Sequence, residues 1–98
     1  MEKKVFITIN HLDECFGSTQ FRIGEKLVLK KDHNNMYDDE AIGVYKEKDY
    51  RCGYVANSVS TVARGTYSAG RLYDQIGEEA NCVVRFITEE MLIAEIES

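Results

Sequence analysis

The residues with the most evident binding chemistry gather in one polar segment, which runs from Asp32 to Glu40 and reads Asp-His-Asn-Asn-Met-Tyr-Asp-Asp-Glu. Its carboxylates and carboxamides accept hydrogen bonds from hydroxyl groups, and such residues also bond their own backbone in tight turns. We therefore weigh two readings of Tyr37 and Asp38. In the first, the two side chains hold a ligand. In the second, Asp38 caps backbone N–H groups and Tyr37 packs on the barrel. The two roles are compatible.

A second segment with binding chemistry is the loop in which Arg64 and Arg71 frame the residues Gly-Thr-Tyr-Ser-Ala-Gly. Backbone N–H groups, hydroxyls and arginines in such a loop can hold a phosphate. The loop is not a P-loop, because no Gly-Lys-Thr/Ser follows. The alternative is a connection between two helices that carries two exposed arginines. Lys31, just before the polar turn, either meets a phosphate there or is a solvated strand residue.

Catalytic and metal-binding arrangements find no support in the sequence. The three cysteines, Cys15, Cys52 and Cys82, are odd in number and lack the close spacing of zinc ligands. We predict free, mostly buried thiols in a reducing compartment. His11 and His33 lie 22 positions apart, and neither falls in a Ser-His-Asp or Cys-His arrangement. We expect no metal, no cofactor and no enzymatic activity.

The net charge of -5 comes entirely from the C-terminal segment. Residues 1–75 carry 11 basic and 11 acidic side chains, whereas residues 76–98 carry one basic side chain and six acidic ones. Strong non-specific DNA affinity needs a concentrated cationic stripe, which this distribution excludes, but a local basic face remains compatible with it. The sequence contains no apolar run of about 18 residues, and the apolar stretch at its start is too short and too broken for a signal peptide, so we predict a cytoplasmic protein without membrane contact.

The 98 residues predict one domain, residues 1–98, built mainly from short strands. The first of two helices should begin at Asn57 or Ser58 and end at Gly65, and the second should span about Ala69–Gly77. Six short strands at this spacing favour a small barrel, with the helices inserted between the fourth and fifth strands. The predicted strands are Lys4–Asn10, Lys26–Lys31, Ala41–Tyr45, Arg51–Ala56, Asn81–Thr88 and Met91–Glu97.

The segment from Leu29 to Tyr45, followed by Cys52-Gly53-Tyr54-Val55, resembles the HIRAN domain family. In that family a strand leads into an Asn-x-Tyr-Asp turn, then an Ala-Ile-x-Val strand, then Gly-Tyr-Val and a helix. These motifs occur here in the same order, and the resemblance is best over residues 16–65. The family includes stand-alone bacterial proteins and the N-terminal DNA-end-binding domain of the helicase-like transcription factor.

The resemblance implies an OB-like, six-stranded antiparallel barrel that binds the 3′ end of single-stranded DNA in a repair or processing context. By position, Tyr37, Asp38 and Asn35 would hold the terminal nucleotide and its 3′-hydroxyl. An aromatic-basic segment before the second strand assists in the family, and Phe16 matches its ring. The basic residue at the family's helix start falls at Asn57.

Several positions depart from the family pattern. Family prolines are replaced by His33 and Met36, the segment at Phe16 has no arginine, and Asn57 is uncharged. Phe16 and Tyr54 are each either a stacking surface or part of the core and barrel wall. These departures favour an alternative function, a protein-interaction or accessory domain that keeps the fold without DNA binding and contacts a helicase or nuclease.

The candidate binding residues that follow from the motifs and the resemblance are Asn35, Tyr37, Asp38, Phe16, Tyr54, Asn57, Lys31, Arg64 and Arg71.

Overall fold

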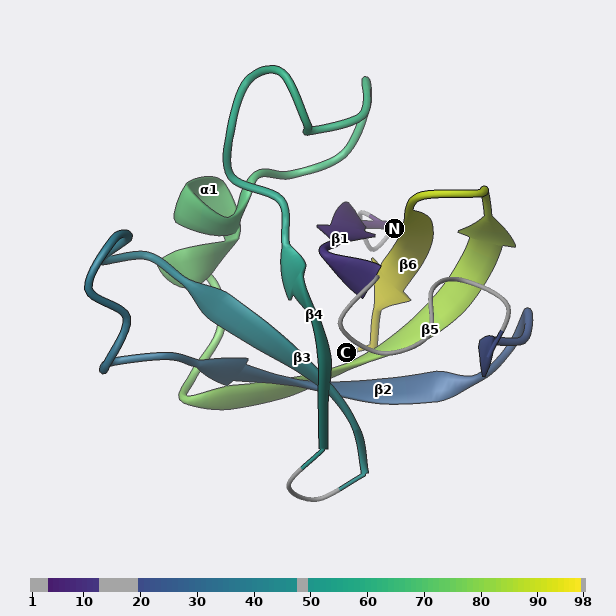
Figure 1. Cartoon of the computed structure of the whole chain (residues 1–98), viewed down its shortest axis with the longest axis horizontal. Helices are drawn as coiled ribbons and strands as arrows, with labels where there is room; N and C mark the ends of the chain where they lie inside the picture. The colour runs from purple at the N-terminus through teal and green to yellow at the C-terminus, as the bar shows by residue number, and fades with distance from the viewer. Residues whose placement is uncertain (1–3, 13–19, 48–49, 98) are drawn as a thin grey trace.

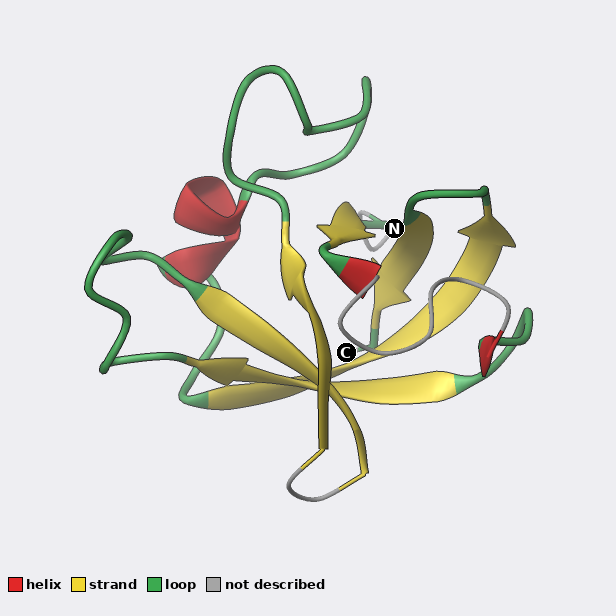
Figure 2. Ribbon diagram, in the orientation of Figure 1, coloured by secondary structure: helices red, strands yellow, loops and turns green. Residues whose placement is uncertain are grey.

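The fold is a closed antiparallel barrel of six strands with one short helix, as the computed structural model shows (Figure 1; Figure 2). The structure describes residues 4–12, 20–47 and 50–97. Around the barrel the strands follow the order β1-β4-β3-β2-β5-β6, which confirms the predicted fold class. The elements are β1 (Phe6–Asn10), β2 (Lys26–Lys31), β3 (Ile42–Glu47), β4 (Tyr50–Val55), α1 (Ala69–Tyr73), β5 (Glu79–Ile87) and β6 (Leu92–Ile96).

Alternating side chains of the strands fill the barrel. Ile7 and Ile9 of β1 face inward with Leu27 and Leu29 of β2, and all four are fully buried. Since inward and outward positions alternate along a strand, this pattern is the one that the apolar spacing predicts. The core cluster is completed by Leu12, Phe21, Ile42, Val44, Cys52, Val55, Tyr67, Ala69, Leu72, Cys82, Val84, Leu92 and Ala94.

Cys52 and Cys82 are both fully buried and neither is in a disulfide, which confirms the prediction of buried thiols for these two residues. Burial, with smaller effects from Cys52 and Glu97, raises the pKa of Cys82 to about 12. This thiol therefore stays protonated at neutral pH and serves as a small apolar core residue. Cys15 lies outside the described residues.

Gly53, the glycine of the Gly-Tyr-Val motif, lets the backbones of β4 and β1 approach closely. A Cβ atom at this position would lie 2.8 Å from the carbonyl oxygen of Asn10 and 3.0 Å from Cγ2 of Ile9. Real Cβ atoms essentially never come so close to backbone, so any side chain here would push the two strands apart. The glycine is thus a requirement of barrel closure.

The first predicted helix, from Asn57 or Ser58 to Gly65, is wrong. The segment forms successive turns. The carbonyl of Ser58 accepts from the N–H groups of Thr61 and Val62, which starts a helical turn, but Val59 is 98% exposed. A short helix is stable only when an apolar face packs against the core, and this segment buries too little apolar surface to stabilise one.

The second predicted helix is confirmed in a shorter form, α1, after the N-cap Ser68. The Ser68 hydroxyl accepts from the N–H of Arg71, and Leu72 is buried. Tyr73 is the last residue of α1, and it packs against the core with Ile76, beyond the helix.

Thr8 of β1 fixes the loop between β4 and α1. Its side chain is fully buried, although it faces away from the barrel interior. Its hydroxyl lies 2.8 Å from the Thr66 hydroxyl and accepts from the N–H of Ala63 at 3.0 Å. Backbone bonds from Ala56 to Thr8 and from Tyr67 to Phe6 hold the two ends of the loop. Figure 1 shows this loop rising from β4 and returning to α1.

We expect Gly53→Ala to destabilise the domain by about 1–3 kcal/mol, because the new Cβ overlaps backbone that cannot move without opening the β1–β4 contact. Thermal unfolding followed by circular dichroism would measure this as a lower Tm. Gly77→Ala is the matched control, since a Cβ there meets nothing within 4 Å. Equal Tm values for the two variants would contradict the argument.

Candidate nucleic-acid interface

The polar turn between β2 and β3 is built by its own side chains. The N–H of Asp32 bonds the carbonyl of Ala41 at 2.8 Å and closes the loop. Inside it, the Asn35 side-chain oxygen accepts from the N–H groups of Tyr37 at 2.9 Å and Asp38 at 3.0 Å. Asp38 in turn accepts from the N–H of Glu40 at 2.9 Å. These bonds fix the turn and leave Tyr37 97% exposed.

Asn57 connects the turn to α1 through both ends of its carboxamide. Its Nδ2 donates to Oδ2 of Asp38 at 3.0 Å, and its Oδ1 accepts from the N–H of Gly70 at 2.8 Å. Gly70 packs closely here, because a Cβ would lie 2.5 Å from a carboxylate oxygen of Glu40. Each carboxylate oxygen of Asp38 therefore accepts one hydrogen bond within the protein, and each keeps a lone pair for a further donor.

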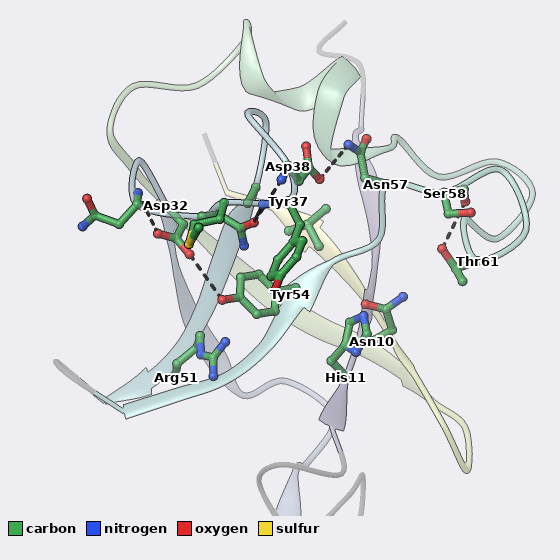
Figure 3. Close-up of a pocket in the computed structure, with 15 residues that line it drawn as sticks. Asn10, His11, Asp32, Tyr37, Asp38, Arg51, Tyr54, Asn57, Ser58 and Thr61 are labelled. Atoms are coloured by element: carbon green, nitrogen blue, oxygen red, sulfur yellow. Dashed lines mark hydrogen bonds between the residues drawn. The ribbon is translucent and has the colours of Figure 1, made fainter.

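A cleft of about 710 Å³ opens beside this turn (Figure 3). It lies between the turn, the end of β1, strand β4 and the start of the loop that follows β4. Its lining residues are Asn10, His11, Asp32, Asn34, Asn35, Met36, Tyr37, Asp38, Ala41, Arg51, Tyr54, Val55, Asn57, Ser58 and Thr61.

Tyr54 lies at the centre of this cleft in a chain of polar contacts. Its hydroxyl donates to Oδ2 of Asp32 at 3.3 Å, and Cζ of Arg51 lies 4.6 Å from the centre of its ring. Burial raises the pKa of Tyr54; Arg51 opposes that shift and Asp32 adds to it. The phenol therefore remains protonated and acts as a donor at neutral pH.

His11 closes one side of the cleft through an unusual backbone. It has a φ of 60°, in the left-handed region that few residues other than glycine adopt. This conformation follows the end of β1, and the His11 ring meets Tyr54 edge to face at a centroid distance of 6.2 Å.

Five of the predicted residues come together in the cleft: Asn35, Tyr37, Asp38, Tyr54 and Asn57. They come from the turn, from β4 and from the loop after it, so the motifs that are separate in the sequence meet at one place.

Lys31 is not among the residues that line the cleft. Its Nζ donates to the carbonyl of Ile76 at 3.0 Å and lies 4.3 Å from the centre of the Tyr73 ring. It thus fastens β2 to the segment around α1. Phe16 lies outside the described residues.

Arg64 and Arg71 also lie outside the cleft lining. The guanidinium of Arg71 stacks on the Tyr67 ring, with Cζ 3.8 Å from its centre. Two backbone donors of the loop between the two arginines bond the barrel, since the N–H of Tyr67 donates to the carbonyl of Phe6 and the N–H of Ala69 donates to the carbonyl of Ala56. These bonds favour the structural alternative, although the segment connects turns, and not a first helix, to α1.

The cleft also contains residues outside the predicted set of binding residues, above all Arg51, His11 and Asp32, of which only Asp32 belongs to the polar segment. In a regular strand Arg51 and Tyr54, three positions apart, would point to opposite faces. The β3–β4 pairing shifts register on both sides of Tyr45, and both side chains reach the cleft. The sequence offered no signal for this irregularity beyond the charged loop that precedes β4.

Within the described residues, no three His, Cys, Asp or Glu side chains gather as metal ligands would. No helix in the same part of the chain is long and apolar enough to cross a membrane.

The barrel and its cleft, with exposed tyrosine, carboxylates and amides, define a small binding module of the OB-like type. The HIRAN domain family matches residues 9–76, and the chain belongs to this family. HIRAN domains are generally DNA-binding modules.

The fold has a solved counterpart in the crystal structure of a Lactobacillus plantarum protein, a structural genomics target. The two share 24% identity over 98% of each chain, with a TM-score of 0.57, which shows a common fold. No curated protein matches the chain.

We expect Asn57→Asp to destabilise the domain in a pH-dependent way. The variant keeps an acceptor for Gly70 but sets a second carboxylate against Asp38, which raises the pKa of the pair. Because the carboxyl pKa values of the folded variant lie above those of the unfolded chain, the variant keeps its stability at low pH. It loses stability as the pH rises through the folded-state values. The Tm deficit relative to wild type should therefore be larger at about pH 7 than at about pH 4.5. An equal deficit at both pH values would contradict the Asn57–Asp38 contact.

Proposed function

We propose that the cleft binds the 3′ end of single-stranded DNA, with the Asp38 carboxylate accepting the 3′-hydroxyl and the Tyr37 ring stacking on the terminal base. The observation that carries this proposal is the pairing of a half-buried, oriented Asp38 with the exposed Tyr37 next to it. Figure 3 shows Tyr37 extending from the turn on the side of the cleft where Tyr54 lies.

The charges of the cleft favour an end over the middle of a strand. Asp32 and Asp38 disfavour phosphates near them but accept hydroxyl protons well, and a 3′-terminus is the place where a DNA strand offers a hydroxyl instead of a phosphate. The six acidic residues of the C-terminal segment are absent from the described cleft lining, so they do not add to this repulsion at short range. The role we propose is binding, without a catalytic step, in DNA repair or processing.

Fluorescence anisotropy with labelled oligothymidylates that end in a 3′-hydroxyl or a 3′-phosphate tests the proposal. Wild type should prefer the hydroxyl end, and Asp38→Asn should lose about tenfold or more of that preference, because a hydrogen bond to a charged group is worth about 1.5–3 kcal/mol. Asp39→Asn is the matched control: it removes the same charge from an exposed neighbour that does not line the cleft. Equal binding of both ends by wild type would refute end recognition.

Tyr37→Ala should weaken binding about 5- to 150-fold, which corresponds to the loss of one base stack of about 1–3 kcal/mol. Tyr37→Phe should keep most of the affinity, because it retains the ring. Since Tyr37 is 97% exposed, neither change should alter the Tm. Unchanged affinity of Tyr37→Ala would remove the stacking role.

A second candidate function is the accessory domain that docks on a helicase or nuclease. Met36 and Val59 are 91% and 98% exposed, and covering these apolar side chains with a partner would remove their surface from water, which favours association. It would replace the first proposal if the purified domain showed no DNA affinity at low salt and bound a purified helicase or nuclease subunit in a manner that Met36→Ser and Val59→Ser abolish.

A further inference from the structure

Arg51 stands out among the charges of the cleft. Of the described residues that line it, Arg51 is the only lysine or arginine, and two carboxylates, Asp32 and Asp38, line it with Arg51. Lys31 and Arg71, the nearby cations that the sequence suggested, contact Tyr73 and Tyr67 respectively and do not line the cleft. Among the described lining residues, Arg51 is therefore the arginine or lysine that a phosphate entering the cleft would meet.

Arg51 contacts the aromatic ring of Tyr54. Cζ of Arg51 lies 4.6 Å from the centre of that ring, and the Tyr54 hydroxyl is oriented by its bond to Asp32. A guanidinium carries five N–H groups in a planar fork, so a cation–π contact with Tyr54 is compatible with donation to a phosphate oxygen.

Arg51 and Asp38 lie on opposite sides of Tyr54 in Figure 3. A ligand with a hydroxyl at Asp38 and its base on Tyr37 would continue past Tyr54 towards Arg51. The first charged group that such a strand presents beyond its terminal sugar is the phosphodiester that joins the last two nucleotides.

We propose that Arg51 binds this last phosphodiester, so that the cleft recognises a hydroxyl end and the adjacent phosphate together. The inference rests on the proposed function and adds to it a specificity-determining residue and a minimal ligand, a dinucleotide end. A single cation at this position replaces the charge that Asn57 does not supply. Asp38 then excludes phosphate at the terminus while Arg51 requires it one linkage away.

The test combines a protein variant with a ligand variant. Oligothymidylates with a 3′-hydroxyl carry a neutral methylphosphonate either at the last linkage or at an internal one, and anisotropy gives the affinities. For wild type, the modification at the last linkage should weaken binding about tenfold and the internal one only slightly. Arg51→Gln should bind the unmodified strand about tenfold more weakly and no longer distinguish the two modified strands. Its plot of log affinity against log salt should be flatter by about 0.7.

Controls separate charge, folding and position. Arg22→Gln removes the same charge from an exposed residue outside the cleft and should behave as wild type. Arg51→Lys keeps the charge without the fork and should be intermediate. Tm values show whether each variant is folded.

The possible failures are distinguishable. If folded Arg51→Gln keeps the wild-type penalty at the last linkage, or wild type shows no such penalty, the assignment of Arg51 is overturned. A preserved preference for 3′-hydroxyl over 3′-phosphate in the same experiments would leave the proposed function standing. Loss of that preference in wild type would remove both.

Discussion

The organisation of the cleft depends on the carboxamide of Asn57, which donates to Asp38 and accepts from the backbone of Gly70. One side chain thereby joins the β2–β3 turn, the loop after β4 and the beginning of α1. A carboxamide suits this position because it has a donor and an acceptor at opposite ends. A lysine here would bring a charge but could not accept from Gly70. Asn57 therefore orients the Asp38 carboxylate but supplies no positive charge.

Much of the barrel could be predicted from the sequence, because strands with one buried face show their period directly. Leu27 and Leu29 of β2 are fully buried as their spacing requires, and the β3–β4 and β5–β6 hairpins occur where predicted. The helix at Asn57 could not be judged in this way. The segment has the apolar spacing of a helix, but tertiary contacts, such as those of Thr8 with Ala63 and Thr66, stabilise turns in place of the helix.

The part of the candidate site that lies in a sequence motif could be predicted. The part that depends on irregular strand pairing could not. The turn chemistry of Asn35 and Asp38 follows from their side chains, which bond nearby N–H groups. Arg51 lines the cleft where the β3–β4 pairing shifts register around Tyr45, and no residue type in the sequence predicts such a shift. Lys31 shows the converse case: its position beside the turn is as expected, yet the carbonyl of Ile76 and the Tyr73 ring attract it elsewhere.

The β4–α1 loop has two roles in different parts of its length: its ends attach it to the barrel, and its outer part lines the cleft. Backbone bonds at Ala56 and Tyr67 and the Thr8 hydroxyl fix the loop at its ends, while Ser58 and Thr61 of its outer part form a wall of the cleft. Because Val59 is 98% exposed, we expect that residues around it can be added or exchanged without disturbing strand pairing. A change in this outer part of the loop would then alter the wall of the cleft and leave the barrel as it is.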